Sequence, residues 1–282
     1  SNALTLVDFW RFSASDVLIH ALPIYHTHGL FVATNTLLLA GGTMLFLPKL
    51  DPDAIMRLMP RATSMMGVPT FYTRLLKEPG LTREATAGMR LFVSGSAPLL
   101  AQVLEDFRKL FGHTILERYG MTETLMNISN PYDGERRPGS VGFPLPGITV
   151  RVVNGEGHDV PDGETGEVYL KGPNVFAGYW RREEATRNAF DGEWFKTGDL
   201  CVRTPDGYHT LCGRRSDLII SGGFNIYPRE IEEFLMEQQN VAEAAVAGEP
   251  HPVRGEVPVA YIVPRGDLDL TELEATCRNN LA

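Results

Sequence analysis

Residues 119–123 (YGMTE) combine, in five consecutive positions, the side-chain types that a nucleotide and its metal ion require. Tyr119 offers a ring that can stack on a purine, and Gly120 lets the backbone approach a ligand without a Cβ in the way. Thr122 can donate to a phosphate oxygen, and Glu123 is a hard oxygen ligand for Mg²⁺. The same residues could instead end a strand and begin a helix, with Thr122 as its N-cap. Taken alone, the segment leaves both interpretations open.

Four further motifs surround this segment in a defined order. They lie at 22–29 (LPIYHTHG) and 94–99 (SGSAPL) before it, and at 194–200 (WFKTGDL) and 213–232 (GRRSDLIISGGFNIYPREIE) after it. The ordered series resembles the adenylate-forming superfamily of acyl-CoA synthetases, luciferases and peptide-synthetase adenylation domains, over nearly the whole chain. Within that superfamily, Arg118 makes the chain most similar to malonyl-CoA synthetases, including mitochondrial malonyl and methylmalonyl forms, in which this arginine faces the acyl pocket.

The resemblance implies an ATP-dependent ligation of a short dicarboxylic acid, malonate or methylmalonate, to coenzyme A through an acyl-adenylate. ATP, Mg²⁺ and coenzyme A are the cofactors and co-substrates that it implies. An acyl-CoA synthetase for another short, fatty or aromatic acid is an alternative, as is an enzyme that loads a carrier protein. A non-catalytic nucleotide-binding remnant is an alternative of a different class.

Carboxylate activation also requires a ribose anchor and neutralisation of phosphate charge. Asp199 has two oxygens suited to the paired ribose hydroxyls, and Arg214 has a planar fork suited to ribose and phosphate oxygens. A turn aspartate and a solvated arginine are the structural alternatives, and solvation is the role that we expect for Arg215. Backbone at 95–97 could lie along the adenine and acyl groups, or simply turn from strand to helix. The predicted nucleotide-binding residues are Gly95, Ser96, Ala97, Tyr119, Gly120, Thr122, Asp199 and Arg214.

The acyl pocket is assigned to His26, His28 and Arg118. His26 matches the histidine of the family's PxxH motif, where an imidazole could neutralise the attacking carboxylate and later let the pocket admit coenzyme A. A hydrogen-bonded core histidine is the alternative, and His28 is expected as a pocket wall. The resemblance thus assigns catalytic roles to His26, Thr122 and Glu123.

Arg118 determines the expected substrate class. A monocarboxylic acid needs an apolar pocket, in which a desolvated guanidinium without a partner would cost several kcal/mol. A dicarboxylate supplies that partner, and one charge-assisted fork is worth roughly 1.5 to 3 kcal/mol. In the alternative interpretation Arg118 pairs with Glu117 or another acid and points away from the pocket, because alternation places Arg118 and Tyr119 on opposite faces of a strand.

The 282 residues carry 35 acidic and 26 basic side chains, a net charge of -9, which argues against a nucleic-acid surface. Three cysteines without CxxC spacing indicate neither a disulfide framework nor a zinc site, and a reducing compartment fits them best. We therefore expect a cytoplasmic protein, or a mitochondrial matrix protein if the source is eukaryotic. The lipophilic segment 29–47 is interrupted by polar residues and glycines, so we expect a buried helix, a turn and a short strand there rather than a membrane span. Oligomeric state is not predicted.

Changes of periodicity along the chain predict its organisation. Residues 1–138 alternate short apolar runs with helical spacing, which indicates an α/β layer. Residues 139–215 contain many short strand patterns separated by Gly and Pro, as in a small β-barrel-like subdomain. Together they would form the large AMP-binding domain, and 216–282 would form a small mobile α+β domain hinged at Ser216 and Asp217. Gly222 and Gly223 would lie beside the pantetheine arm of coenzyme A once that domain rotates.

Two family features have no counterpart in the sequence. Relatives carry a Ser/Thr/Gly-rich phosphate loop before the first motif and an acylation lysine near the C-terminus. Neither is present in these 282 residues, so we expect the sequence to be a fragment. We do not expect these residues alone to catalyse the reaction.

Overall fold

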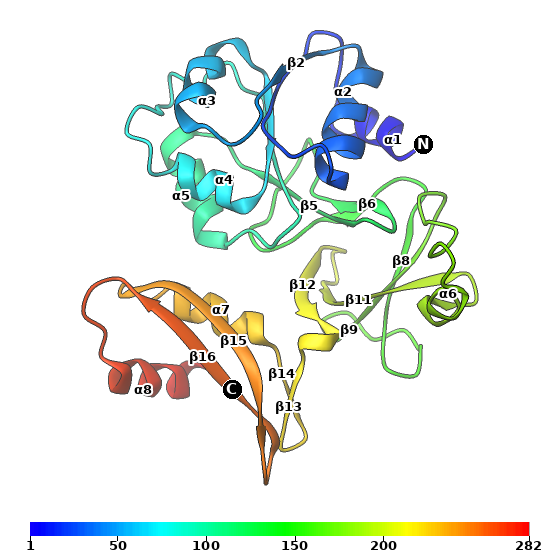
Figure 1. Cartoon of the computed structure of the whole chain (residues 1–282), viewed down its shortest axis with the longest axis vertical. Coiled ribbons are helices and arrows are strands. Elements are labelled where there is room, and N and C mark those ends of the chain that lie inside the picture. The colour runs from blue at the N-terminus through cyan, green and yellow to red at the C-terminus, as the bar shows by residue number, and fades with distance from the viewer. Residues whose placement is uncertain (282) are drawn as a thin grey trace.

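The computed structural model describes residues 1–281, which form three β-sheets with flanking helices (Figure 1). The first sheet has the order β2-β1-β3-β4-β5-β6-β7, with parallel pairing from β2 through β5 and antiparallel pairing from β5 to β7. Its strands are β1 Val17–His20, β2 Thr43–Phe46, β3 Ser64–Gly67, β4 Leu91–Ser94, β5 Leu116–Met121, β6 Leu125–Ser129 and β7 Phe143–Pro144. The α/β layer predicted for the first part of the chain is therefore observed.

Helices cover the first sheet because its central strands are apolar on both faces. Tyr72, Phe92 and Phe107 meet edge to face between the sheet and two helices, with ring centroids 5.0–6.5 Å apart. The helical segments are α1 Asn2–Phe9, a π-helical segment His28–Thr34, α2 Asn35–Ala40, α3 Pro52–Leu58, a 3₁₀ turn Met59–Arg61, α4 Pro69–Leu75 and α5 Ala101–Phe111.

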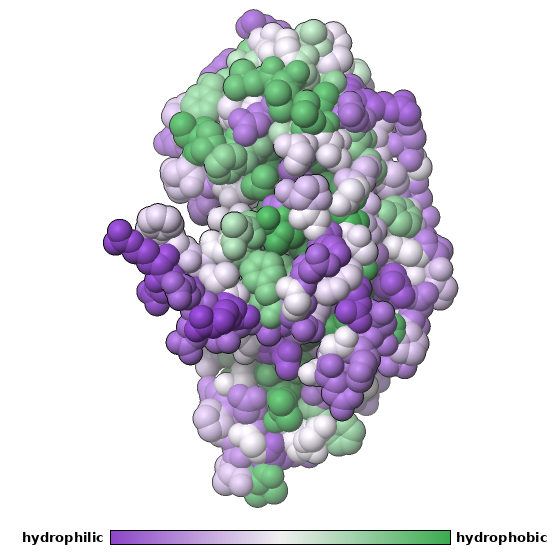
Figure 2. All heavy atoms as spheres, turned by 90° about the vertical axis from the view of Figure 1, so that its right-hand side faces the viewer, coloured by the Kyte–Doolittle hydropathy of each residue, from purple (hydrophilic) through white to green (hydrophobic). Residues whose placement is uncertain are grey.

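Segment 29–47 forms the expected helix, turn and strand, and Gly41 ends the helix with φ +74°. The helix is buried on one face only, because Val32 and Leu37 are fully buried, whereas Phe31, Leu38 and Leu39 are between 47% and 62% exposed. Figure 2 shows hydrophobic residues gathered on the upper part of one face of the molecule. Within residues 1–281, no helix is both long enough and apolar enough to span a membrane.

The second sheet has the order β10-β11-β9-β8, and β12 pairs with β11. Its strands are β8 Thr149–Val153, β9 Thr165–Lys171, β10 Phe190–Asp191, β11 Trp194–Arg203 and β12 His209–Arg214. The helix α6, Glu183–Ala189, was not expected in this strand-rich part. None of its residues is buried, so it carries no apolar periodicity that the sequence could reveal.

The third sheet, of order β14-β13-β16-β15, follows a 3₁₀ turn at Arg215–Asp217. Its elements are β13 Ile219–Ser221, β14 Phe224–Ile226, α7 Pro228–Met236, β15 Val241–His251, β16 Gly255–Pro264 and α8 Leu270–Asn280. The sequence pattern predicts β13, α7, β15, β16 and α8 but not β14, and β15 and β16 extend beyond the predicted strands 242–248 and 257–263. Residues such as Leu235 and Val246 pack between α7, α8 and this sheet as a separate small core.

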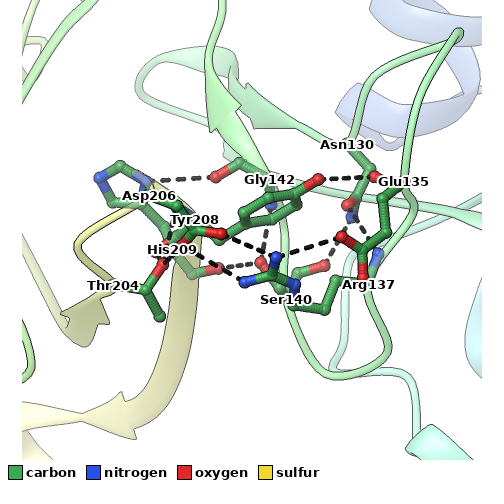
Figure 3. Close-up of polar contacts among 9 residues, drawn as sticks. All are labelled: Asn130, Glu135, Arg137, Ser140, Gly142, Thr204, Asp206, Tyr208 and His209. Carbon is green, nitrogen blue, oxygen red and sulfur yellow. Dashed lines mark hydrogen bonds and ion pairs between the residues drawn. The ribbon is translucent and has the colours of Figure 1, made fainter.

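A polar cluster joins the segment after β6 to the hairpin of β11 and β12 (Figure 3). The Ser140 hydroxyl donates to the His209 carbonyl at 2.8 Å and accepts the Gly142 amide at 3.1 Å. The Arg137 guanidinium lies 3.8 Å from the centroid of the Tyr208 ring. These contacts fix the first sheet relative to the second one.

We expect Ser140→Ala to destabilise the fold by about 1–3 kcal/mol, because the buried Gly142 amide loses its acceptor, while the His209 carbonyl keeps only the Val141 amide as a donor. Ser140 is 1% exposed, so water cannot replace its hydroxyl. Urea unfolding of the variant, compared with the exposed Ser15→Ala as a control, measures the difference. A loss for Ser140→Ala no greater than that for the control would show that the cluster does not stabilise the junction.

Candidate functional site

A cavity of about 590 Å³ lies between the large part of the chain and the small C-terminal part. The carboxyl end of β5 and the loop after β4 form one wall, which is where ligands bind in open parallel sheets. β12, the connecting turn and residues of α7 form the opposite wall. Of the predicted site residues, those that line the cavity are Ser96, Ala97, Arg118, Tyr119, Gly120, Asp199, Arg214, Ser216 and Asp217.

Asp199 is the centre of a short polar chain in this cavity. The Tyr119 hydroxyl donates to Asp199 Oδ2, and Arg214 Nε lies 2.8 Å from Asp199 Oδ1. Burial raises the pKa of Asp199, while Tyr119 and Arg214 oppose that shift by stabilising its charge. The structure thus brings together three of the residues predicted to contact a nucleotide, from β5, β11 and β12.

Thr122 and Glu123 lie in the turn between β5 and β6, outside the residues that line the cavity. Glu123 Oε1 accepts a hydrogen bond of 3.0 Å from the Tyr179 hydroxyl. Its charge also helps to raise the pKa of Asp199, so the two carboxylates are near one another. The strand β6 follows this turn directly, so the alternative in which Thr122 caps a helix is wrong.

Arg118 is buried without an acidic partner. It is 3% exposed, and its Nε and Nη2 atoms have no hydrogen-bond partner among the described residues. Burial lowers the pKa of Arg118 to about 10. The predicted alternative, a pair with Glu117, is not formed, because Glu117 Oε1 accepts the Leu99 amide at 3.0 Å and Oε2 has no partner in the part of the chain described. The guanidinium is thus desolvated and unpaired in residues 1–281.

Gly95 explains how the Arg118 side chain fits. A Cβ at Gly95 would lie 2.4 Å from Arg118 Cζ, so any larger residue would displace the guanidinium. Gly95 itself lies behind the cavity wall rather than along it. Its predicted contact with a nucleotide is therefore not seen, and its observed neighbour is the arginine.

Of the two histidines, His28 is buried beside the loop that carries Ser96, as a pocket wall would be, whereas His26 is exposed. His26 is exposed, its ring lies 5.0 Å from that of Tyr25, and it does not line the cavity. His28 is 4% exposed, and its Nδ1 lies 3.2 Å from Ser96 Oγ. Burial and the neighbouring Arg118 charge hold the pKa of His28 well below its ordinary value. His28 is thus the histidine beside the Arg118 side of the cavity.

Gly222 and Gly223 form the two-residue turn between β13 and β14, with φ +59° and +87°. This conformation favours glycine, and neither residue lines the cavity. Ser216 and Asp217 lie in the short connection between the second and third sheets, as a hinge would.

Arg215 is exposed, as expected, and it also pairs with a buried acid. Its Nη1 donates to Glu167 Oε2 at 2.6 Å, and Glu167 is only 6% exposed. The other Glu167 oxygen accepts the Gly198 amide, next to Asp199. The sequence could not show this pair, because the two residues are 48 positions apart.

Glu117 lines the cavity but was not predicted as a site residue, although a charged residue inside a buried strand is a detectable signal. Burial raises the pKa of Glu117 from 4.5 to about 7, with charges on Arg229 and Arg118 opposing the shift. The acid lines the same cavity as Arg118 and Arg229.

The pKa of Glu117 predicts a pH dependence of stability. Between pH 4.5 and about 7 the folded protein keeps a proton that the unfolded chain releases. The contribution of Glu117 is therefore lost as the pH rises through about 7. We expect Glu117→Gln to flatten the decline in the free energy of unfolding between pH 5 and pH 8. Equal declines in the variant and the wild type would contradict the raised pKa.

Comparison with known proteins places the site in a family context. A model of the AMP-binding enzyme family matches residues 1–180, and a model of the AMP-binding enzyme C-terminal domain matches residues 230–282. The chain is similar to MatB from Rhodopseudomonas palustris, whose ATP-bound crystal structure superposes on it with a TM-score of 0.97. The two sequences are 55% identical, and the match covers 100% of this chain and 57% of MatB.

Curated relatives include several CoA ligases with similar sequence identity to this chain. The mitochondrial malonate–CoA ligase of Homo sapiens is 36% identical over 98% of this chain and 55% of its own length. The sulfoacetate–CoA ligase of Cupriavidus necator is 40% identical over 95% of this chain and 53% of its own length. A long-chain-fatty-acid–CoA ligase of Yersinia pestis is 36% identical over 94% of this chain and 48% of its own length. The chain thus spans about half the length of these relatives.

Proposed function

Because the chain belongs to the AMP-binding enzyme family, we propose that the protein activates a short dicarboxylic acid with ATP and transfers the acyl group to coenzyme A. In the first step the acid's carboxylate oxygen bonds to the α-phosphorus of ATP and pyrophosphate leaves. In the second step the coenzyme A thiolate bonds to the acyl carbon and AMP leaves. Malonate or methylmalonate is the proposed acid.

The cavity supplies the groups that the first step needs. Asp199 accepts from the ribose hydroxyls, and Arg214, already paired with Asp199, reaches ribose and phosphate oxygens from the same position. Ser96, Ala97 and Gly120 form a wall with little side-chain bulk beside the nucleotide. Holding the acid and the α-phosphate in line converts a bimolecular reaction into an effectively intramolecular one.

Mg²⁺ fits the residues at Glu123. One Glu123 oxygen accepts from Tyr179, which orients the carboxylate and leaves the other oxygen for a cation. Residues 1–281 contain no cluster of three or more His, Cys, Asp or Glu that could enclose a metal. A single carboxylate with phosphate and water ligands is the typical arrangement for Mg²⁺, and the bound ion would neutralise phosphate charge.

The unpaired Arg118 guanidinium is the observation that carries the choice of a dicarboxylate. A buried cation is costly unless it is paired, and the second carboxylate of malonate would be its partner. Relatives named for malonate and for sulfoacetate act on acids with a second anionic group, which supports this choice. A relative named for long-chain fatty acids is equally similar overall, so similarity alone does not select the acid.

Acid-dependent exchange of pyrophosphate into ATP tests the proposal in the protein that carries this chain. We expect exchange with malonate or methylmalonate and little with butyrate. Exchange that prefers butyrate would indicate an acyl-CoA synthetase for another acid. If the chain binds ATP but no acid supports exchange, a non-catalytic nucleotide-binding protein would be the better description.

A further inference from the structure

Ser96 has a backbone conformation that its side chain disfavours. Its φ is +71°, in the left-handed region that glycine adopts freely and serine adopts at a cost. Packing does not require a serine at this position, because the Ser96 side chain is exposed at the cavity wall. Non-glycine residues held in this region cluster at binding sites, where the strained residue has another use.

The hydroxyl of Ser96 has a buried partner that can orient it. Ser96 Oγ lies 3.2 Å from His28 Nδ1, and His28 is almost fully buried behind the cavity wall. His28 Nε2 has no hydrogen-bond partner among the described residues. A neutral imidazole carries one N–H, and the position of that proton decides what Ser96 can do. If Nδ1 carries it, the imidazole donates to Ser96 Oγ, and the hydroxyl proton is free to point into the cavity.

Arg118 lies near this arrangement. Its positive charge opposes protonation of His28, so the imidazole is neutral and carries a single N–H. Two Arg118 nitrogens are also without partners in residues 1–281, and Ser96 lines the cavity together with Arg118. The free hydroxyl proton and the unpaired guanidinium therefore lie on the same cavity wall.

We propose that the Ser96 side chain is a specificity residue that donates to the distal carboxylate of the acid beside Arg118, and that His28 is the residue that positions its hydroxyl. This inference rests on the proposed dicarboxylate substrate and adds a second donor to it. The strain at Ser96 is retained because glycine, which would relieve it, cannot donate.

Two Ser96 variants separate the hydroxyl from the backbone strain. Ser96→Ala and Ser96→Gly should each lower kcat/KM for malonate by about 10- to 100-fold, the usual effect of losing a hydrogen bond to a charged group. Only Ser96→Gly should raise the melting temperature, because glycine accepts the positive φ. The matched control is Arg181→Gly, since Arg181 has φ +53° away from the cavity. It should raise the melting temperature and leave kcat/KM for malonate unchanged.

His28 variants and histidine NMR test the positioning role. His28→Asn should keep most of the malonate activity, because the asparagine amide can replace Nδ1–H, whereas His28→Leu should lose as much as Ser96→Ala. In ¹⁵N spectra of the wild-type chain, His28 should be neutral with the proton on Nδ1. A proton on Nε2, or equal activity of His28→Leu and the wild type, would overturn the role of His28.

The failure of this inference differs from the failure of the proposed function. If the wild type exchanges pyrophosphate with malonate and Ser96→Ala does so equally well, the role of Ser96 is wrong and the dicarboxylate remains. If the wild type does not use malonate or methylmalonate, both proposals are wrong.

Discussion

Arg118→Ala should lower kcat/KM for malonate by about two to three factors of ten, or about 3 to 4 kcal/mol. The guanidinium lies in a desolvated position where water cannot replace an ion pair. Activity with butyrate should not fall in parallel, and it should rise where the apolar tail no longer meets an unpaired cation. Steady-state kinetics with both acids measures the two effects.

A half-buried arginine, Arg136, provides the control for a structural effect. Arg136 donates to the backbone carbonyls of Thr114, Pro131 and Tyr132. Arg136→Ala should lower the melting temperature without changing the preference between the two acids. Arg118→Ala should not lower the melting temperature, because it removes a buried charge that has no acidic partner in the described chain. Equal losses for malonate and butyrate, together with lower stability, would exclude the dicarboxylate assignment.

Glu123→Gln should lower the rate of pyrophosphate exchange by about two factors of ten, because an amide is a poor ligand for Mg²⁺ and leaves the phosphate charge less neutralised. The fold should remain intact, since Glu123 is partly exposed and its hydrogen bond from Tyr179 can pass to the amide oxygen. Raising the Mg²⁺ concentration should recover part of the rate.

The exposed Glu193, which pairs with Lys171 on the second sheet, is the control for a general effect of charge. Glu193→Gln should exchange pyrophosphate at the wild-type rate. If Glu123→Gln also keeps that rate, Glu123 is a structural residue and the proposed metal site is wrong.

Local patterns predicted most of the fold because most of its elements carry them. The strands β3 and β4 are short, fully buried apolar runs, and α5 presents an apolar stripe to the sheet and ends at Gly112 with φ +77°. The helix α6 carries no such pattern, since it buries no residue, and it was missed.

The site was predictable where one motif supplies neighbouring groups and unpredictable where distant segments meet. Residues Arg118 to Gly120 lie together on the cavity wall because one strand carries them. The pair of Arg215 with Glu167 and the contact of Ser96 with His28 join residues 48 and 68 positions apart, so no spacing in the sequence indicates them. The same limit explains why the sequence could not show which of the two neighbouring histidines is buried beside Arg118.

A crystal structure of the protein with a hydrolysis-resistant malonyl adenylate tests the central claim most directly. The proposal predicts that the distal carboxylate lies within hydrogen-bond distance of the Arg118 guanidinium, while the ribose hydroxyls contact Asp199. An adenylate whose distal carboxylate lies away from Arg118, with that arginine paired to a protein carboxylate instead, would contradict it.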